Sequence, residues 1–378
     1  MKTSSISVSL LLLAASTAAQ DHAGGAMPNP KVPEHDALTA FVGKWHCDVT
    51  INMPGMGEQK GTATEDTELV CNGLFARSIV NGTLMGMPMQ GISLVGYDAN
   101  EKRYTAMWVD STSPEAEESV LTVDTKTRTW TSKRLSGPGA TRAVMTFKDD
   151  NTVEQAAYMN GTDGKETRVF HIIKKRQVAN AKPAGKANAN TEPASTKVVA
   201  QTDAQAVVPQ AQAQTKAQPA QAAPTAKELA GYVGKWATVM TMGPAADGEG
   251  DKGTEVNSAA CNGMWLWADF KSTFMGGPFE GHSLTACAGG KVLTYWIDST
   301  SGYVSKLTGT HDAKTGAMTL QGHTRDPMGG HMETTEKSVW TSEHSRELTM
   351  EFKTPEGPMT MKIAYKRQHE DGAHAIKK

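Results

Sequence analysis

The sequence lacks most of the features that would indicate a polyanion partner or a familiar catalytic site. Lys and Arg number 38 and Asp and Glu number 40 among 378 residues, which gives a formal charge of −2. Without a net basic field, the chain has no general means of holding nucleic acid, so we expect no nucleic-acid partner. The sequence contains no Gly-x-Ser-x-Gly elbow, phosphate-cradling loop or His-Glu-x-x-His motif. No reaction is therefore indicated, although a triad built from distant residues would escape this search.

Long apolar runs are also missing beyond the first residues. Lys2 precedes an apolar stretch at 8–15, and Thr17-Ala18-Ala19 offers the small residues of a cleavage site. We interpret residues 1–19 as a signal peptide, because this stretch is short for a membrane span. The mature protein is then expected to be periplasmic or secreted, without membrane insertion after signal cleavage. An uncleaved N-terminal anchor is the alternative.

Cysteine is scarce, with two residues in each half of the chain. An even number in an oxidising compartment makes disulfides possible. The simplest pairing joins Cys47 to Cys71 and Cys261 to Cys287. Only Cys71 and Cys261 occupy matching positions in the two halves, so four buried free thiols are the alternative.

The feature that dominates the sequence is an internal repeat. Segments of the first half return about 190 residues later, in the same order. The matching pairs are Phe41-Val42-Gly43-Lys44-Trp45 with Tyr232-Val233-Gly234-Lys235-Trp236, Cys71-Asn72-Gly73 with Cys261-Asn262-Gly263, Trp108-Val109-Asp110-Ser111 with Trp296-Ile297-Asp298-Ser299, and Lys175-Arg176 with Lys366-Arg367. A nearly constant offset indicates a duplicated domain, and we place the two modules at 33–176 and 225–367.

Residues 177–224 separate the modules and consist mostly of Ala, Gln, Pro, Lys, Thr and Val, without an aromatic residue. Such a segment cannot bury enough apolar surface to offset its ordering entropy. We predict a disordered linker, with short Ala-rich helical pieces as the alternative.

Within each module, short β-type runs alternate with turn clusters such as Asn81-Gly82 and Gly137-Pro138-Gly139. Many short strands at close spacing predict an all-β fold, an up-and-down antiparallel β-barrel in each module. A short helix is expected at the start of each copy, before Gly43 and Gly234. A two-sheet sandwich is the alternative architecture.

Gly43-x-Trp45 at the start of the first strand, with Arg176 at the end of the last, resembles the calycin pattern of lipocalins and fatty-acid-binding proteins. The second copy repeats the pattern with Trp236 and Arg367. In that superfamily the Trp closes one end of the barrel and the Arg packs across it, so the resemblance implies a structural role for these four residues.

A resemblance to the bacterial family called domain of unknown function 1579 covers nearly all of both modules. It rests on Gly86-Met87-Pro88-x-x-Gly91, Gly96-Tyr97-Asp98, the Trp-x-Asp-Ser segments and the final Lys-Arg pairs. The second copy departs from it at Ala286-Cys287-Ala288, where Gly-Tyr-Asp is expected, so any role of that turn is in doubt there. The resemblance implies a tandem calycin-like fold and no activity.

Asp110 and Asp298 are the most promising shared polar positions. Each follows a tryptophan, Trp108 or Trp296, by two residues, so strand alternation places each pair on one face. That face is a candidate ligand-binding surface, with Met85, Met87 and Phe279 near the mouth of a barrel. The alternative is that the Asp-Ser-Thr-Ser segments cap strand ends through hydrogen bonds to the backbone.

Thioethers and imidazoles could bind copper in an exported protein. Between the copies, however, Met87 becomes Gly277 and Met89 becomes Phe279, which favours apolar packing. No histidine is shared by the two copies. We therefore predict no metal and no cofactor.

Together these patterns favour an exported protein that binds a small apolar or lipid-like molecule inside its barrels. An enzyme acting on a small organic or lipid-like substrate is one alternative. A structural or protein-interaction module with filled barrels is the other. The sequence does not indicate an oligomeric state.

Overall fold

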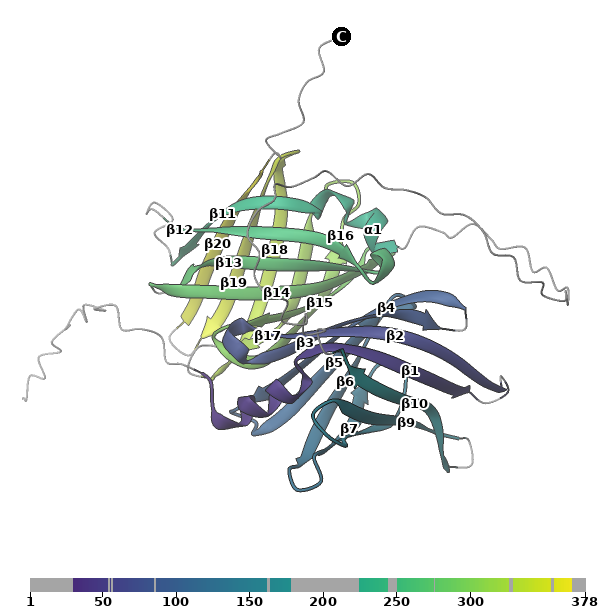
Figure 1. Ribbon diagram of the computed structural model, residues 1–378. Coiled ribbons are helices and arrows are strands. Elements are labelled where there is room, and N and C mark those ends of the chain that lie inside the picture. The colour runs from purple at the N-terminus through teal and green to yellow at the C-terminus, as the bar shows by residue number, and fades with distance from the viewer. Residues whose placement is uncertain are drawn as a thin grey trace, which may run out of the picture.

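The computed structural model describes residues 30–53, 55, 57–84, 86–161, 164–177, 224–243, 250–274, 276–325, 329–354 and 357–368. Met85 and the predicted signal peptide lie outside these residues, as does nearly all of the predicted linker. The described residues form two closed antiparallel barrels of ten strands each, which confirms the predicted fold class over the sandwich (Figure 1).

The first barrel follows a 3₁₀ helix, η1 (Pro33–Phe41), which is the short helix expected at the start of this copy. Its strands are β1 (Gly43–Met53), β2 (Gly57–Val70), β3 (Phe75–Leu84), β4 (Met87–Asp98), β5 (Arg103–Asp110), β6 (Ser113–Asp124), β7 (Thr129–Ser136), β8 (Arg142–Phe147), β9 (Thr152–Asn160) and β10 (Glu166–Arg176). A short 3₁₀ turn, η2 (Cys71–Gly73), joins β2 to β3.

The second barrel begins with a short helix, α1 (Pro224–Glu228), and a 3₁₀ turn, η3 (Ala230–Tyr232). Its strands are β11 (Gly234–Met242), β12 (Asp251–Ala260), β13 (Trp265–Phe274), β14 (Gly277–Ala288), β15 (Lys291–Asp298), β16 (Ser301–His311), β17 (Met318–Arg325), β18 (His331–Ser342), β19 (Ser345–Thr354) and β20 (Gly357–Arg367). The turn η4 (Cys261–Gly263) corresponds to η2.

Each barrel closes by pairing its first strand with its last. Trp45 lies opposite Arg176 in the β1–β10 ladder, and Trp236 lies opposite Arg367 in the β11–β20 ladder. The guanidinium carbon lies 4.0 Å from the Trp45 ring centre in the first barrel and 4.2 Å from that of Trp236 in the second. Both indoles are buried, so a cation–π contact of about 0.5–2 kcal/mol joins the strands at one end of each barrel.

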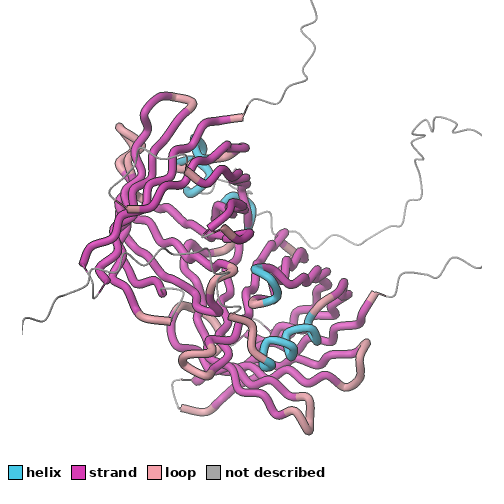
Figure 2. The backbone as a smooth tube through the Cα atoms, turned by 90° about the vertical axis from the view of Figure 1, so that its left-hand side faces the viewer, coloured by secondary structure: helices cyan, strands magenta, loops and turns pink. Residues whose placement is uncertain are grey.

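The outer walls of the two barrels pack against each other (Figures 1 and 2). One apolar cluster contains residues of both modules, including Ile92 and Val109 of the first and Leu284 and Ile297 of the second. The two modules are thus in direct contact and share part of their core.

This contact is reciprocal. The Cys261 amide donates to the side-chain oxygen of Gln90 at 2.6 Å, and the Cys71 amide donates to Glu280 at 3.0 Å. Gln90 and Glu280 occupy equivalent positions, as do the two cysteines, so the modules are related by an approximate two-fold axis. The repeated Cys-Asn-Gly turns present these amides with a positive φ at both Cys and Asn, a conformation that Asn tolerates better than most residues.

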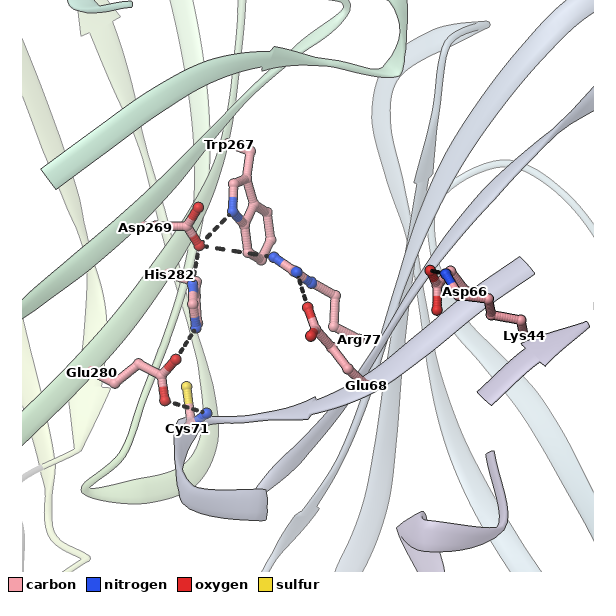
Figure 3. Close-up of polar contacts among 9 residues, drawn as sticks. All are labelled: Lys44, Asp66, Glu68, Cys71, Arg77, Trp267, Asp269, Glu280 and His282. Carbon is pink, nitrogen blue, oxygen red and sulfur yellow. Dashed lines mark hydrogen bonds and ion pairs between the residues drawn. The ribbon is translucent and has the colours of Figure 1, made fainter. Parts of the chain in front are cut away.

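Polar side chains surround one of these contacts (Figure 3). His282 is buried between Asp269 and Glu280, at 2.8 and 3.2 Å, and stacks on Trp267. The guanidinium carbon of Arg77, in the first module, lies 4.8 Å from the Trp267 ring centre, and Arg77 Nη1 lies 3.8 Å from Asp269. His282 therefore supports the contact between modules through Glu280, which accepts from the Cys71 amide, a role that its mismatch with Ile92 did not reveal.

None of the four cysteines is in a disulfide, so the possible pairings do not form. Cys47 belongs to the interior cluster of the first barrel, whereas Cys71 belongs to the cluster between the modules. Cys261 also lies between the modules, and Cys287 lies in an interior cluster of the second barrel. The members of each proposed pair thus pack in different places.

The shared cluster generates a prediction about the intact protein. If a specific protease site is placed within 178–223 and cut, we expect the two fragments to remain together in size-exclusion chromatography. The variant Leu284→Asp, which puts a charge in the shared cluster, should weaken the association, because an unpaired charge is costly to bury. The control is Lys337→Asp, at an exposed position on the outer face of β18, away from the first module. Separate elution of the unmutated fragments would contradict the contact.

Candidate functional site

The second barrel encloses a cavity of about 230 Å³. Side chains from all ten of its strands line this cavity, together with Leu229 and Tyr232 from the segment before β11. Strand alternation explains the arrangement: in β19, Arg346, Leu348, Met350 and Phe352 share one face and all line the cavity.

The end of the cavity away from Trp236 is lined mainly by apolar side chains, with Arg325 at the end of β17 as its charged member. Its aromatic members are Phe274, Phe279, Trp296 and Phe352, and its methionines are Met242, Met350, Met359 and Met361. Phe279 stacks on Trp296, with ring centres 6.4 Å apart and an interplanar angle of 22°. Methionine side chains are flexible and polarizable, so this end can adapt to apolar groups of different shapes.

The opposite, closed end is polar and centred on Arg346, which is 5% exposed. Its guanidinium pairs with buried Glu255, and its Cζ lies 3.4 Å from the ring centre of Tyr365. Tyr232 and Trp236 flank the same guanidinium at 5.2 and 5.3 Å. A buried charge needs such partners, because an isolated guanidinium would be costly to remove from water.

Three polar groups at this end have capacity left for a ligand, and one of them is the Ser338 hydroxyl. Arg346 Nε and Asn257 Oδ1 are buried without a hydrogen-bond partner among the described residues. Asn257 Nδ2 donates to Tyr232 O at 3.1 Å and to Glu255 Oε1 at 2.7 Å, which leaves the Oδ1 acceptor toward the cavity lining. Buried unpaired polar atoms are rare in proteins and indicate a place for a partner.

Glu336 of β18 also lines the cavity. Burial raises the pKa of this carboxyl to about 7, and the nearby Glu255 adds to the rise, although Arg346 opposes it. The group therefore changes charge near neutral pH. Raised carboxyl pKa values often occur at functional sites, although buried structural groups show them as well.

The corresponding end of the first barrel has a different buried ion pair, in which Lys174, at the position of Tyr365, lies 2.6 Å from Glu65, at the position of Glu255. In the strand ladders, Arg346 lies opposite Tyr365 on one side and Trp340 on the other. Val153 holds the same place in the first barrel, opposite Lys174 and Phe147. By the same register, Ala143 stands where the second barrel has Glu336. Phe147 and Val153 pack with Trp130 in a buried cluster. The first module therefore keeps the glutamate but pairs it with a lysine, and the positions of Arg346 and Glu336 are charged in the second module alone.

The sequence-predicted residues of the second module lie at the cavity, since Trp296, Asp298 and Phe279 all line it. Asp298, however, is already occupied: it accepts hydrogen bonds from Trp296 Nε1 at 2.7 Å, Thr300 N at 2.8 Å and Thr300 Oγ1 at 2.5 Å. Its oxygens fix the indole and the following turn, as the strand-capping alternative proposed.

Trp108 and Asp110 repeat this geometry in the first barrel. Asp110 accepts from Trp108 Nε1 at 2.9 Å and from Thr112 N at 2.7 Å. The indole lies across Gly91, where a Cβ would come within 2.2 Å of the ring, and Trp296 lies across Gly281 in the same way. The repeated glycines therefore make room for the two indoles.

The predicted methionine rim does not gather at this site. Met87 is 60% exposed at the start of β4, and Met85 lies outside the described residues. Met87 is the first residue of β4, at the end of the barrel, and its side chain is exposed to solvent.

Gly96-Tyr97-Asp98 has a role that its loss from the second copy did not suggest. Asp98 caps the turn after β4 by accepting from Asn100 N and Glu101 N. It also pairs with Arg325 of the second module at 3.0 Å, and both side chains are buried. Because Arg325 lines the cavity, the first module contacts the wall of the binding site.

One cluster has residue types that bind metals. Glu228, Cys287 and His311 place a carboxylate, a thiol and an imidazole within 4.8 Å of one another. The Glu228 carboxylate, however, accepts from the amides of Gly289 and Gly290 at 2.8 Å and from the Cys287 thiol at 3.2 Å. These hydrogen bonds account for the cluster as the attachment of α1 to the turn after β14, and we assign it no metal.

Sequence reasoning missed Arg346, Glu255, Glu336 and Asn257. A signal was present in β19, where an arginine interrupts the face that carries Leu348, Met350 and Phe352. A charged residue on an otherwise apolar face indicates a buried ion pair or a site. Reading it required the strand register, which the sequence alone does not provide.

No helix in the described part of the chain is long and apolar enough to cross a membrane.

Comparisons with known proteins agree with the tandem architecture. The family model described as "Protein of unknown function (DUF1579)" matches residues 30–176 and again 221–367. No curated protein matches the chain.

Several solved structures show a distant likeness. A redesigned β-barrel is 16% identical, with 39% of this chain and 97% of that chain covered and a TM-score of 0.22. A protein of unknown function of the DUF3598 family from Nostoc punctiforme is 9% identical, with 89% and 100% covered and a TM-score of 0.24. A double mutant of transferrin binding protein B from Haemophilus parasuis is 8% identical, with 87% and 76% covered and a TM-score of 0.19. These likenesses carry no functional argument.

The raised pKa of Glu336 predicts how stability depends on pH. Burial moves the pKa from 4.5 to about 7, so the folded protein holds this proton more tightly than the unfolded chain. The contribution of Glu336 to stability is therefore greatest at acid pH, falls as pH rises from 4.5 to about 7, and is constant above that range.

Chemical denaturation of Glu336→Gln from pH 5 to pH 8 measures this effect. The gain in unfolding free energy relative to the natural protein should increase from pH 5 to about pH 7 and then level off. Glu333→Gln, on the outer face of the same strand, is the control and should show no such increase. A gain independent of pH in Glu336→Gln would show that the carboxyl titrates normally.

Proposed function

The chain belongs to the DUF1579 family of proteins of unknown function, so membership assigns no activity, and we propose from its geometry that it binds a small apolar or lipid-like molecule in the second barrel. The observation that carries this proposal is the cavity of about 230 Å³. A small barrel either fills its interior with side chains or leaves room for one ligand, and this barrel leaves room.

The distribution of residues within the cavity supports the proposal. Aromatic rings and methionines surround one end, and buried polar groups stand at the other. A mostly apolar pocket with a few convergent polar groups is the usual composition of a small-molecule site. An elongated molecule with one polar end would match both regions at once.

The duplication supplies an internal comparison. At equivalent ladder positions the first module has Val153 where the second has Arg346, and Ala143 where the second has Glu336. The glutamate itself is common to both modules, since Glu65 stands at the position of Glu255 and pairs with Lys174. The second module therefore differs by an arginine and a second carboxyl group, both of which line its cavity.

Binding of N-phenylnaphthylamine, an uncharged probe that fluoresces in apolar surroundings, tests this proposal. We expect its fluorescence to rise on addition of the intact protein and emission from Trp296 to fall. Trp296→Phe should reduce that fall, and the matched variant Trp108→Phe in the first barrel should not.

A substitution that fills the cavity completes the test. Ala268→Phe adds a ring inside the barrel and should abolish probe binding, whereas Lys271→Phe, on the outer face of the same strand, should leave it unchanged. Because an extra ring in a core can cost about 1–3 kcal/mol, folding is checked by circular dichroism, and the smaller change Ser283→Leu serves if Ala268→Phe unfolds. If folded Ala268→Phe or Ser283→Leu binds the probe as well as Lys271→Phe does, the probe binds outside this cavity.

We also propose that the protein acts in the periplasm or outside the cell. The support is the sequence pattern of residues 1–19, with Lys2, an apolar stretch and small residues before Gln20. Mass spectrometry of the protein recovered from its own host should then find a mature chain that begins at Gln20. Recovery of the uncut chain from the cytoplasm would contradict export.

A further inference from the structure

The charges around the cavity carry an inference about the ligand that rests on the binding function proposed above. Five charged residues line the cavity, three acidic and two basic: Glu255, Asp298, Glu336, Arg325 and Arg346. A ligand can interact only with those charges that the protein itself leaves unbalanced.

Both arginines already have carboxylate partners. Arg346 pairs with Glu255, and three aromatic rings surround its guanidinium. Arg325 pairs with Asp98 at 3.0 Å and with Glu101 at 3.1 Å, both in the first module, and its side chain is 3% exposed. Neither cation has a free charge to neutralise an incoming anion.

Two of the three acidic groups, Asp298 and Glu336, have no cationic partner of this kind among the described residues. Asp298 accepts three hydrogen bonds from Trp296 and Thr300, and none of these donors carries a charge. Glu336 makes no ion pair within 4.0 Å in the described part of the chain. When both are ionised, the lining carries three negative charges against two positive ones. An anionic ligand would add a further negative charge in surroundings of low dielectric constant, where like charges repel strongly.

The unpaired polar atoms fit a different kind of head group. Asn257 Oδ1 is an acceptor without a donor, and the carboxyl oxygens of Glu336 are also acceptors. Arg346 Nε and Arg325 Nε are donors without an acceptor, and the Ser338 hydroxyl has no partner. A hydroxyl group can donate and accept, and an amine can donate several hydrogen bonds, whereas a carboxylate can only accept.

We propose that the second barrel binds amphiphiles whose polar head donates hydrogen bonds and carries no negative charge, and that it discriminates against carboxylates such as free fatty acids. The head lies at the closed end beside Glu336 and Asn257. The hydrocarbon part extends toward the rim of Phe and Met residues. Glu336 is the residue that sets this preference.

Competition among three ligands with the same eight-carbon chain tests the proposal. Octylamine, octanol and octanoate are each used to displace N-phenylnaphthylamine from the intact protein at pH 8, below the concentrations at which they form micelles. We expect octylamine and octanol to bind at least about tenfold more tightly than octanoate, which corresponds to about 1.4 kcal/mol.

Two variants assign the preference to Glu336. Glu336→Gln should weaken the binding of octylamine and strengthen the binding of octanoate. The ratio of their affinities should therefore fall by at least about tenfold. Glu333→Gln removes a carboxyl from the outer face of the same strand and should change neither the affinity for octylamine nor that for octanoate. The probe itself is uncharged, so its binding reports whether the cavity of each variant is intact.

The outcomes separate this inference from the function on which it rests. Failure of the probe and all three ligands to bind would overturn the binding function. Binding of octanoate as tightly as octylamine or octanol would overturn the head-group inference and leave the binding function standing. An unchanged preference in Glu336→Gln would remove the role assigned to this residue.

Discussion

Pairing of the first strand with the last is the constraint on which both modules depend. The β1–β10 and β11–β20 ladders leave neither sheet with a free edge, and a tryptophan and an arginine lie at the same end of each ladder. Closure gives every strand an inner and an outer face. The inner faces then decide whether a barrel is filled or hollow, and the outer faces decide how the modules meet.

The sequence predicted the fold well because its signals were repeated. The Gly-x-Trp segments, the terminal Lys-Arg pairs and the constant offset between copies required no knowledge of strand register. Trp45 and Arg176, far apart in sequence, indeed lie across from each other in one ladder. The repeated Cys-Asn-Gly turns were visible too, but their use in joining the modules depends on side chains from the opposite barrel.

The candidate site was predicted less well, for a physical reason. Repetition identified Trp296 and Asp298, which line the cavity, yet the same pair occurs in the first module because it performs a local task at a strand end. The residues peculiar to the polar end of the second barrel, such as Arg346 and Glu336, have the uncharged counterparts Val153 and Ala143 in the first copy. A search for shared positions finds what both modules need for folding and passes over what one of them has acquired.

The approximate two-fold axis has a consequence for how such a chain can vary. Glu118 and Lys306 occupy equivalent positions and form an ion pair with each other at 2.6 Å, and Arg77 lies over its own equivalent, Trp267. In a symmetric dimer of one module, each of these positions would face an identical copy, so glutamate would meet glutamate. Joining two copies in a single polypeptide removes that requirement, because each side of the axis can mutate alone. One barrel is then free to change its interior while its sister supplies a complementary wall.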